Sequence, residues 1–502
     1  MMEPSLIIIG SGVAGLTAGC YARMNQYPTT ILEMAETPGG LCTSWRRKGY
    51  LFDGSVAGLA GAAPGSPLFR LWEEIGVARY CPLHYGENFG HIHLPDGRTI
   101  TIFTDIDRLE AHLLRHFPSE AKVVREFTGA LRSVQDLDFP FSDARGWDAV
   151  KYNIQTTVST AAHLPVLFKY GTQTIRQFIS KINDPAMAAV FSNLAHFGGL
   201  DLPLLTVLLP LAYAHRKMAG IPRHGWLSFA RAIERRFIEL GGTIRYKAKV
   251  ERLIVENGAV RGVVLAGGAC LYAHRVLSAA DGRFSESLLL GKQEGETNRQ
   301  YHPQDISDQP AQVNIGVDED FSAEDGPVTY ILTDRFKAAG REHERITVHN
   351  KYYDPDAAPK GKSALTVFLD SDYPWWKEVA TDPARYQAEK ERCANRVIEV
   401  IERYHPGFRD RIEVIDVSTP LTRERYTGNW MGAMQARKPD AHMIRTLLQG
   451  APRYADREVK GLYMAGQWVE AWGGITTAAR SGRKAIQAMC KNDGKRFSTT
   501  RA

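Results

Sequence analysis

The stretch from Leu6 to Glu33 constrains the fold of this 502-residue chain more than any other part of the sequence. An apolar run, Leu6–Ile9, leads directly into G-S-G-V-A-G, and a second apolar run ends at Glu33. Strand, glycine turn, helix and strand in this order predict a βαβ unit of the Rossmann type. The order of these parts, more than the glycine pattern alone, indicates a dinucleotide site.

Each glycine of this motif has its own physical purpose. Gly10 permits the tight turn out of the strand, Gly12 lets a pyrophosphate approach the backbone, and Gly15 lets helix and strand pack closely. The positive end of the helix then faces the phosphates, beside the small residue Ala14. Glu33 is placed to accept hydrogen bonds from a ribose diol. A glycine-rich turn that binds nothing is the alternative, but it leaves Glu33 unexplained.

The composition disfavours several classes of protein. With 44% apolar and 24% charged residues the chain is globular, and its length predicts at least two domains. The net charge of +6 comes without a dense basic run, which argues against a nucleic acid partner. Weak attraction to anionic lipid and an ordinary solvated surface both stay open. The six cysteines are scattered, which disfavours disulfides and a zinc site and indicates a reducing, cytoplasmic compartment. No residues are assigned to a metal.

A second group of motifs follows the second strand. Gly39 and Gly40 can bring backbone amides against a phosphate or a flavin, and Arg46 or Arg47 can offer a charge to the same anion. Tyr50–Asp53 has the pattern of a short strand. An acid, P-G-G, a basic residue and G-Y-x-F-D-x-G in this order resembles FAD-dependent oxidoreductases of the amine-oxidase and phytoene-desaturase superfamily. The resemblance implies FAD, rather than NAD, as the cofactor.

Two later stretches extend the resemblance over essentially the whole chain. Residues 222–281 resemble the second FAD segment of the superfamily, in which a residue at the Val250 position contacts the adenine through its backbone. Residues 418–432 are similar to the T-P-x-T-x-x-R-Y-T-G-x-x-x-G stretch of the phytoene-desaturase branch. The chain therefore looks like the family of phytoene desaturases, carotenoid isomerases and retinol saturases.

The last motif is a strand, a loop and a helix opened by two glycines. In the family this element lies against the pyrophosphate and the isoalloxazine ring, which assigns Gly466, Gly474 and Ile475 to the cofactor.

The family's usual G-x-G-T-H-P-G-G-G loop reads G-Q-W-V-E-A-W-G-G here. We expect Trp468 and Trp472 to narrow the pocket or to stack on a substrate. Glu470 is a candidate general acid or base if it is buried. Its alternative is to bind backbone amides or a flavin hydroxyl.

The predicted fold class is α/β, a Rossmann-type FAD-binding domain with an inserted α+β substrate domain of antiparallel sheet and helices. The predicted FAD-binding domain comprises residues 1–70, 215–292 and 455–490. The substrate-binding domain comprises residues 71–214 and 293–454, and residues 491–502 are expected to form a loose basic tail. Strand-like runs at 312–317, 328–333, 345–349 and 364–369 form the predicted sheet, and residues 91–100 form a hairpin.

Residues 200–214 are almost continuously apolar. They are too few to span a bilayer, which needs about 20 residues. A buried core helix, the wall of a hydrophobic substrate tunnel and a monotopic membrane patch all remain open.

The resemblance implies desaturation, saturation or isomerisation of carbon–carbon bonds in a lipophilic polyprenoid or carotenoid-like substrate. Hydride transfer with flavin N5, with a proton moving at the neighbouring carbon, is the implied mechanism. Because no second dinucleotide motif is found for NAD(P)H, a quinone, oxygen or a redox protein is the expected electron partner. Peripheral membrane association is also expected. The alternatives are a flavin amine oxidase and a non-catalytic prenyl-lipid-binding protein of the same fold.

Overall fold

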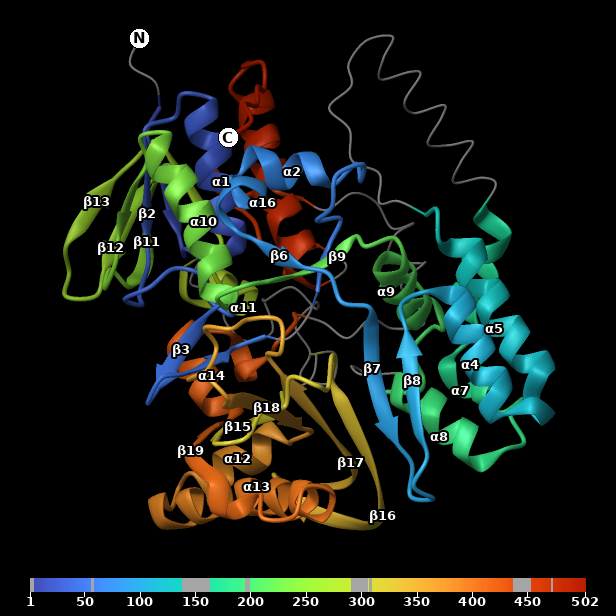
Figure 1. Cartoon of the computed structure of the whole chain (residues 1–502). Coiled ribbons are helices and arrows are strands. Elements are labelled where there is room, and N and C mark those ends of the chain that lie inside the picture. The colour runs from blue at the N-terminus through green and yellow to red at the C-terminus, as the bar shows by residue number, and fades with distance from the viewer. Residues whose placement is uncertain are drawn as a thin grey trace.

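A computed structural model describes most of the chain. The described residues are 4–55, 58–137, 163–194, 199–289, 306, 309–436, 453–470 and 473–502. Figure 1 shows both ends of the chain on the part that holds the first strand, with a second, larger sheet below it.

A five-stranded parallel sheet lies at the centre of the first part, in the order β10-β2-β1-β14-β20. Its strands are β1 (Leu6–Ile9), β2 (Thr29–Leu32), β10 (Thr243–Arg245), β14 (Arg275–Ser278) and β20 (Leu462–Met464). The helix α1 (Val13–Met24) connects β1 to β2. The predicted βαβ unit is therefore confirmed, and its sheet is completed by strands far away in the sequence.

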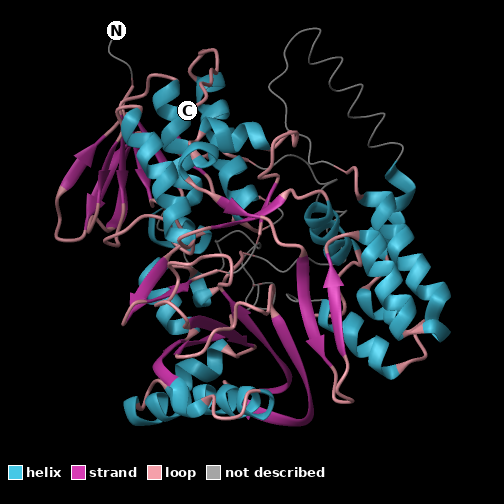
Figure 2. Cartoon of the chain, viewed as in Figure 1, coloured by secondary structure: helices cyan, strands magenta, loops and turns pink. Residues whose placement is uncertain are grey.

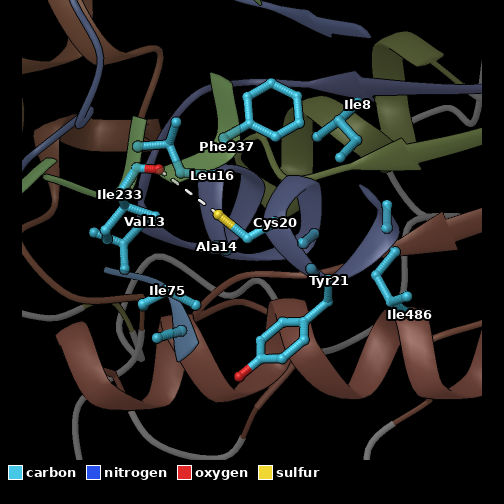
Figure 3. Close-up of a cluster of buried hydrophobic side chains, with 14 of the residues drawn as sticks. Ile8, Val13, Ala14, Leu16, Cys20, Tyr21, Ile75, Ile233, Phe237 and Ile486 are labelled. Carbon is cyan, nitrogen blue, oxygen red and sulfur yellow. Dashed lines mark hydrogen bonds between the residues drawn. The ribbon is translucent and has the colours of Figure 1, made fainter. Parts of the chain in front are cut away.

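Two further helices pack with α1 around this sheet, α10 (Trp226–Glu239) and α16 (Ile475–Asn492). Figure 3 shows their shared core, in which Ile8 of β1, Phe237 of α10 and Ile486 of α16 surround Cys20 of α1. The thiol of Cys20 donates to the carbonyl of Ile233 over 3.6 Å. Burial of such apolar surface is the main stabilising contribution here.

A small antiparallel sheet follows in the order β11-β12-β13. Its strands are β11 (Val250–Glu256), β12 (Ala259–Leu265) and β13 (Cys270–Tyr272). The first two form the hairpin that Asn257 and Gly258 favour, and both of these residues have positive φ angles of 50° and 70°.

The larger sheet has seven strands in the order β19-β15-β18-β17-β16-β7-β8. Its strands are β7 (Asn88–His93), β8 (Thr99–Phe103), β15 (Ala311–Val317), β16 (Val328–Ala338), β17 (Arg341–Asn350), β18 (Ser363–Leu369) and β19 (Ile412–Ser418). The predicted antiparallel strands are confirmed, and the predicted hairpin joins them through a parallel pairing of β16 with β7. Both stretches assigned to the substrate-binding domain thus share one sheet. The domain boundaries stay a prediction.

One face of this sheet is covered by α12 (Tyr373–Val379) and α13 (Pro383–Tyr404). Val313, Val348 and Val367 of the sheet pack with Val397 of α13 in one apolar core. The side chain of Asp382 accepts hydrogen bonds from the first free amides of α13, as expected for an N-cap that precedes proline. The opposite face of the sheet is left for other contacts.

A cluster of helices lies beside β7 and β8, on the right of Figure 2. It contains α4 (Ile106–His116), α5 (Ala121–Val134), α7 (Ile175–Ile179), α8 (Pro185–Leu194), α9 (Leu205–His215) and a helical stretch at residues 163–172. These helices share an apolar core with the hairpin. Within the part of the chain that the structure describes, no helix is both long and apolar enough to cross a membrane.

Short elements complete the described chain. They are β3 (Ser44–Arg47), β4 (Tyr50–Asp53), β5 (Leu59–Ala60), α2 (Phe69–Glu74), α3 (Val77–Tyr80), β6 (Leu83–His84), η1 (Pro118–Glu120), β9 (Ala219–Pro222), α11 (Gly282–Phe284), η2 (Ser285–Leu289), η4 (Arg409–Arg411), α14 (Pro420–Thr427) and η5 (Trp430–Gly432).

The C-terminal tail differs from its prediction as a loose segment. The amide of Ser498 donates to the side chain of Asn25 over 2.8 Å, and the Arg236 guanidinium donates to the hydroxyl of Thr500 over 3.0 Å. The ring of Phe497 packs on Tyr21. The tail is held because α1 and α10, which are distant in sequence, offer it partners that its own polar composition does not reveal.

Candidate functional site

A cavity of about 1900 Å³ lies at the carboxyl ends of β1, β2 and β14 and extends to the free face of the seven-stranded sheet. Ligand pockets usually measure about 300–1,000 Å³, so this one has room for two molecules. Most of the predicted cofactor residues line it. They are Gly10, Gly12, Ala14, Glu33, Gly39, Gly40, Arg47, Val250, Gly466, Gly474 and Ile475.

In the first glycine motif, Gly12 and Gly15 lie in different surroundings. Gly12 is the N-cap of α1, and a Cβ built there would meet nothing within 4 Å, so its bare backbone opens on the cavity. Gly15 does not line the cavity, and a Cβ there would overlap the carbonyl oxygen of Gly10. Gly15 therefore allows close packing, as predicted, and has no direct contact with a ligand.

The carboxylate of Glu33 accepts hydrogen bonds from the loop that follows β1 and from the loop that follows β2. One oxygen accepts from the amide and the hydroxyl of Ser11 at 2.7 and 2.8 Å, and the other accepts from the amide of Ala35 at 2.8 Å. A carboxylate offers about four lone-pair sites, so these three donors leave one for a ligand hydroxyl. Glu33 is 7% exposed and lines the cavity. The predicted ribose contact is compatible with this arrangement and stays a prediction.

The second glycine pair joins the same cradle. The amide of Gly39 donates to the carbonyl of Ser11 over 2.9 Å, which holds the two loops together. Of the two candidate arginines, Arg47 lines the cavity, with its Nε 3.5 Å from the Asp416 carboxylate. Arg46 is turned away and donates to the carbonyls of Gly49 and Asp356.

The N-terminus of α16 supplies a second bare surface. Gly466 and Gly474 have φ angles of 123° and 105°, and a Cβ built on either would meet nothing within 4 Å. Gly474 is the N-cap of α16, and Ile475 follows it at the cavity wall. The N-termini of α1 and α16 thus both direct free amides and a positive partial charge into one cavity. These features fit the diphosphate and the electron-rich ring of FAD.

The residues predicted for catalysis are not all at the cavity. Trp468 lines it and is 4% exposed, packed with Met431 and Ala433. Glu470 does not line it. Its Oε1 accepts from the Tyr454 hydroxyl at 2.5 Å and lies 3.9 Å from Nζ of Lys484.

Trp472 lies outside the described residues. The pKa of the Tyr454 hydroxyl is raised, mainly because the side chain is buried and to a smaller extent because the charge of Glu470 lies nearby. The role of Glu470 as acid or base remains a prediction.

A buried ion pair at the cavity was missed by the sequence reasoning. Asp53 and Lys351 are in contact, and their side chains are 5% and 9% exposed. Asp53 also accepts from the Ser44 hydroxyl at 2.5 Å and from the amide of Trp226 at 3.0 Å. The sequence motif G-Y-x-F-D contains Asp53, but no local pattern indicates that this aspartate contacts a lysine 298 positions away.

Asp281 is a second missed residue of the cavity lining. It lies after β14 and accepts from the amides of Phe284 at 3.1 Å and Trp430 at 3.0 Å. Burial raises the pKa of its carboxyl to about 6, because desolvation disfavours the charged form. An acid at the end of a parallel strand was the available signal.

The stretch that resembles the phytoene-desaturase motif forms α14 and lines the cavity from Thr422 to Asn429. Arg423 is 8% exposed and donates to the carbonyls of Gly432 and Pro310. Burial lowers the pKa of its guanidinium to about 9. This motif thus forms a wall of the cavity.

The far part of the cavity is bounded by the lipophilic segment. Leu205, Leu208 and Leu211 of α9 are buried in the helical core, whereas Leu209 and Pro210 line the cavity. The core-helix interpretation is therefore confirmed for one face of the helix, and the other face lines a cavity, as the tunnel-wall interpretation requires. That the cavity holds a hydrophobic substrate, and that this segment contacts a membrane, stay predictions.

Comparisons with known proteins agree with this architecture. The family model described as "Flavin containing amine oxidoreductase" matches residues 13–490. A prolycopene isomerase of Arabidopsis thaliana is 24% identical over 95% of this chain and 81% of its own length. A lycopene-forming phytoene desaturase of Pseudescherichia vulneris is 23% identical over 97% of this chain and 99% of its own. The solved structure of cyclohexylamine oxidase from Brevibacterium oxydans has a TM-score of 0.58 at 12% identity, covering 98% and 100% of the two chains.

Proposed function

The chain belongs to the family of flavin-containing amine oxidoreductases, and from this premise we propose that it acts on carbon–carbon bonds of a lipophilic, polyprenoid-like substrate. It is an FAD-dependent oxidoreductase with the fold expected from its sequence. The proposed reaction is desaturation, saturation or isomerisation. The names of its curated relatives, an isomerase and a desaturase, support this class of chemistry.

The observation that carries the proposal is the two-part cavity. One end presents the N-termini of α1 and α16, and the other is bounded by Leu209 and Pro210 of α9 and by Leu202 before it. A dinucleotide fits the first end, and an apolar chain fits the second. A single connected space brings the two ligands together, which a hydride transfer requires.

Bound FAD would supply the hydride acceptor or donor. The protein's own residues bind, orient and exclude water. Trp468 and the apolar residues of α9 keep the reacting region dry, which strengthens electrostatic interactions inside it. The amides at Gly12 and Gly474 hold negative charge at two points, and the charges of Asp53 and Lys351 compensate each other at the wall.

An amine oxidase is the second candidate, favoured by the fold of cyclohexylamine oxidase. A charged amine needs a polar route with an available carboxylate. Several carboxylates line the cavity. Asp53 is bound to Lys351, Asp416 to Trp45 and Arg47, and Glu424 to Tyr373, and α9 presents an apolar wall. These contacts favour the lipid reaction over the amine reaction. A flavin-free prenyl-lipid-binding protein is the third candidate, and the open surfaces at Gly12 and Gly474 argue against it.

Electron acceptor and membrane contact complete the proposal. We infer a quinone or oxygen as the acceptor and peripheral association with a membrane, from which such substrates are extracted. Leu164 and Phe168, one turn apart on the helical stretch 163–172, are 55% and 68% exposed. Exposed apolar side chains beside Lys169 suit a shallow contact with lipid.

The test is reduction of the bound flavin under anaerobic conditions. The purified protein is mixed with an acyclic carotene in detergent or with a primary amine, and the visible flavin absorbance is followed. Bleaching by the carotene, or isomerisation detected by chromatography, supports the proposal. Bleaching by the amine alone would favour the second candidate, whereas failure to bind FAD would contradict both enzyme assignments.

A further inference from the structure

The seven-stranded sheet contributes several polar side chains to the cavity lining, beside apolar ones such as Phe368 and Val417, although the proposed substrate is a lipid. On β17, Val348 packs under α13, whereas Arg345, Thr347 and His349 line the cavity. On the neighbouring strands, Gln312 and Thr366 line it and are 1% and 5% exposed. Three of these side chains already have partners in the sheet, since Gln312 and Thr366 both donate to Asn314 and the Thr347 hydroxyl pairs with that of Thr329.

Arg345 is the side chain on this face with the least compensation. Among the described residues, no carboxylate lies within ion-pairing distance of its guanidinium. Its one hydrogen bond is to the carbonyl of Ser192 on α8, and at 3.5 Å it is long. Arg345 is half-buried, so part of its hydration is already lost.

The neighbouring cations on the same floor are differently placed. Lys351 is paired with Asp53. Burial lowers the pKa of the His343 imidazole, so this side chain does not add a second positive charge at neutral pH. Arg345 is left with a positive charge and unused donors beside a cavity.

The same part of the cavity has an apolar boundary. Leu194 closes α8, two residues after Ser192, and Val207 and Leu209 of α9 continue the wall. A ligand with an anionic end and an apolar chain satisfies both surfaces. An arginine guanidinium binds carboxylate or phosphate with two parallel hydrogen bonds.

We propose that the substrate of this enzyme is an acidic lipid, whose carboxylate or phosphate head group is bound by Arg345 while its apolar chain lies along α9. This inference rests on the proposed function and narrows its substrate class. It makes Arg345 a residue that selects and positions the substrate, because the position of the head group fixes which carbon of the chain reaches the flavin.

The test is equilibrium dialysis of the full-length holoprotein with farnesoate, farnesyl phosphate and farnesol, which share one isoprenoid chain. We expect the wild type to bind at least one of the two anions about ten- to a hundred-fold more tightly than the alcohol. The better anion identifies the head group. Arg345→Gln should remove this preference and leave farnesol binding unchanged, whereas Arg345→Lys should restore part of it.

A matched control is Arg335→Gln, on the adjacent strand β16, where the side chain is 63% exposed and pairs with Glu344. This variant should bind all three ligands like the wild type. Equal binding of the alcohol and both anions by the wild type would overturn the inference without any variant, as would an unchanged preference in a folded Arg345→Gln protein. Flavin absorbance of the same samples separates this outcome from a failure of the proposed function.

Discussion

Gly12 and Gly15 lie three positions apart, at the N-cap and in the first turn of α1, and are needed for different physical reasons. Gly12 faces the cavity and has open space where a side chain would be. Gly15 faces its own strand, and a side chain there would overlap the backbone of Gly10. The fold therefore requires Gly15, and we propose that the cofactor requires Gly12.

A pair of alanine substitutions separates these requirements. In the flavin-free protein, Gly15→Ala should lower the free energy of unfolding by about 1–3 kcal/mol, because overpacking forces the backbone apart. Gly12→Ala should cost less than about 1 kcal/mol, the usual cost of alanine at an N-cap, but should weaken FAD binding by about ten-fold or more. Denaturant unfolding and flavin titration measure the two effects. Equal stability losses would contradict the assignment.

Asp281 gives the protein a pH dependence of predictable sign. Its pKa is about 6 in the folded chain against an ordinary value of 3.8. Between pH 3.8 and about pH 6 this carboxyl therefore binds a proton more often in the folded state than in the unfolded state. The free energy of unfolding therefore falls as the pH rises through this window, by up to about 3 kcal/mol. Asp281→Asn should make that decrease smaller, as measured by unfolding between pH 4 and pH 7. The remaining decrease is assigned to Glu324, whose pKa burial raises to about 7.

Asp320 is the control for this measurement. Its carboxyl is exposed, and a hydrogen bond from Ser322 lowers its pKa. Its small contribution is present at neutral pH and is lost on acidification, so Asp320→Asn should not flatten the pH profile. A profile that Asp281→Asn leaves unchanged would refute the assignment to Asp281.

At the scale of the element, α9 shows how one apolar segment serves two purposes. Its sequence is apolar on every side, and a helix of that kind is buried all round. In the structure one face belongs to the helical core and another bounds the cavity. Hydrophobicity alone did not distinguish these faces, because both environments exclude water.

Two adjacent leucines of α9 test this division. Leu208 is fully buried, so Leu208→Ala should lower the free energy of unfolding by about 2–5 kcal/mol. Leu209 lines the cavity, so Leu209→Ala should cost less stability and weaken the binding of farnesol. Thermal unfolding and equilibrium dialysis give the two readings. The reverse pattern would show that the faces are exchanged.

At the scale of the whole molecule, long-range contacts join segments that the chain visits separately. The parallel sheet takes strands from residues 6–32, 243–278 and 462–464. Asp53 connects three further regions, since it binds Ser44 beside it, the start of α10 and Lys351 at the end of β17. These contacts connect the part that contains the parallel sheet with the seven-stranded sheet beside the cavity.

Breaking the Asp53–Lys351 pair should therefore destabilise the whole molecule. Lys351→Met leaves a buried carboxylate without its cation, which should cost about 3–5 kcal/mol. The double variant Asp53→Asn, Lys351→Met should lose less unfolding free energy than the sum of the losses in the two single variants, because it leaves no unpaired charge. Urea unfolding of the four proteins measures this coupling, and additive losses would contradict it.

The sequence by itself determined the local elements and the cofactor end of the site. Strand β1, the turn at Gly12, helix α1 and the glycines before α16 each depend on short-range backbone requirements, which neighbouring residues display directly. The seven-stranded sheet was foreseen in part for the same reason, since alternation marks each strand. Its extension by β7 and β8 was not foreseen, because pairing partners carry no local signal.

Tertiary structure alone decided which of these residues meet. Trp468 and Glu470 are two positions apart in one loop, yet only Trp468 lines the cavity. Lys351, Asp281 and Arg345 look like ordinary surface charges until distant segments bury them. Burial and ion pairing depend on contacts across hundreds of residues, and the physical chemistry of a charge depends on its surroundings. The sequence is thus sufficient to predict the cofactor, whereas the tertiary packing determines which side chains surround the proposed substrate.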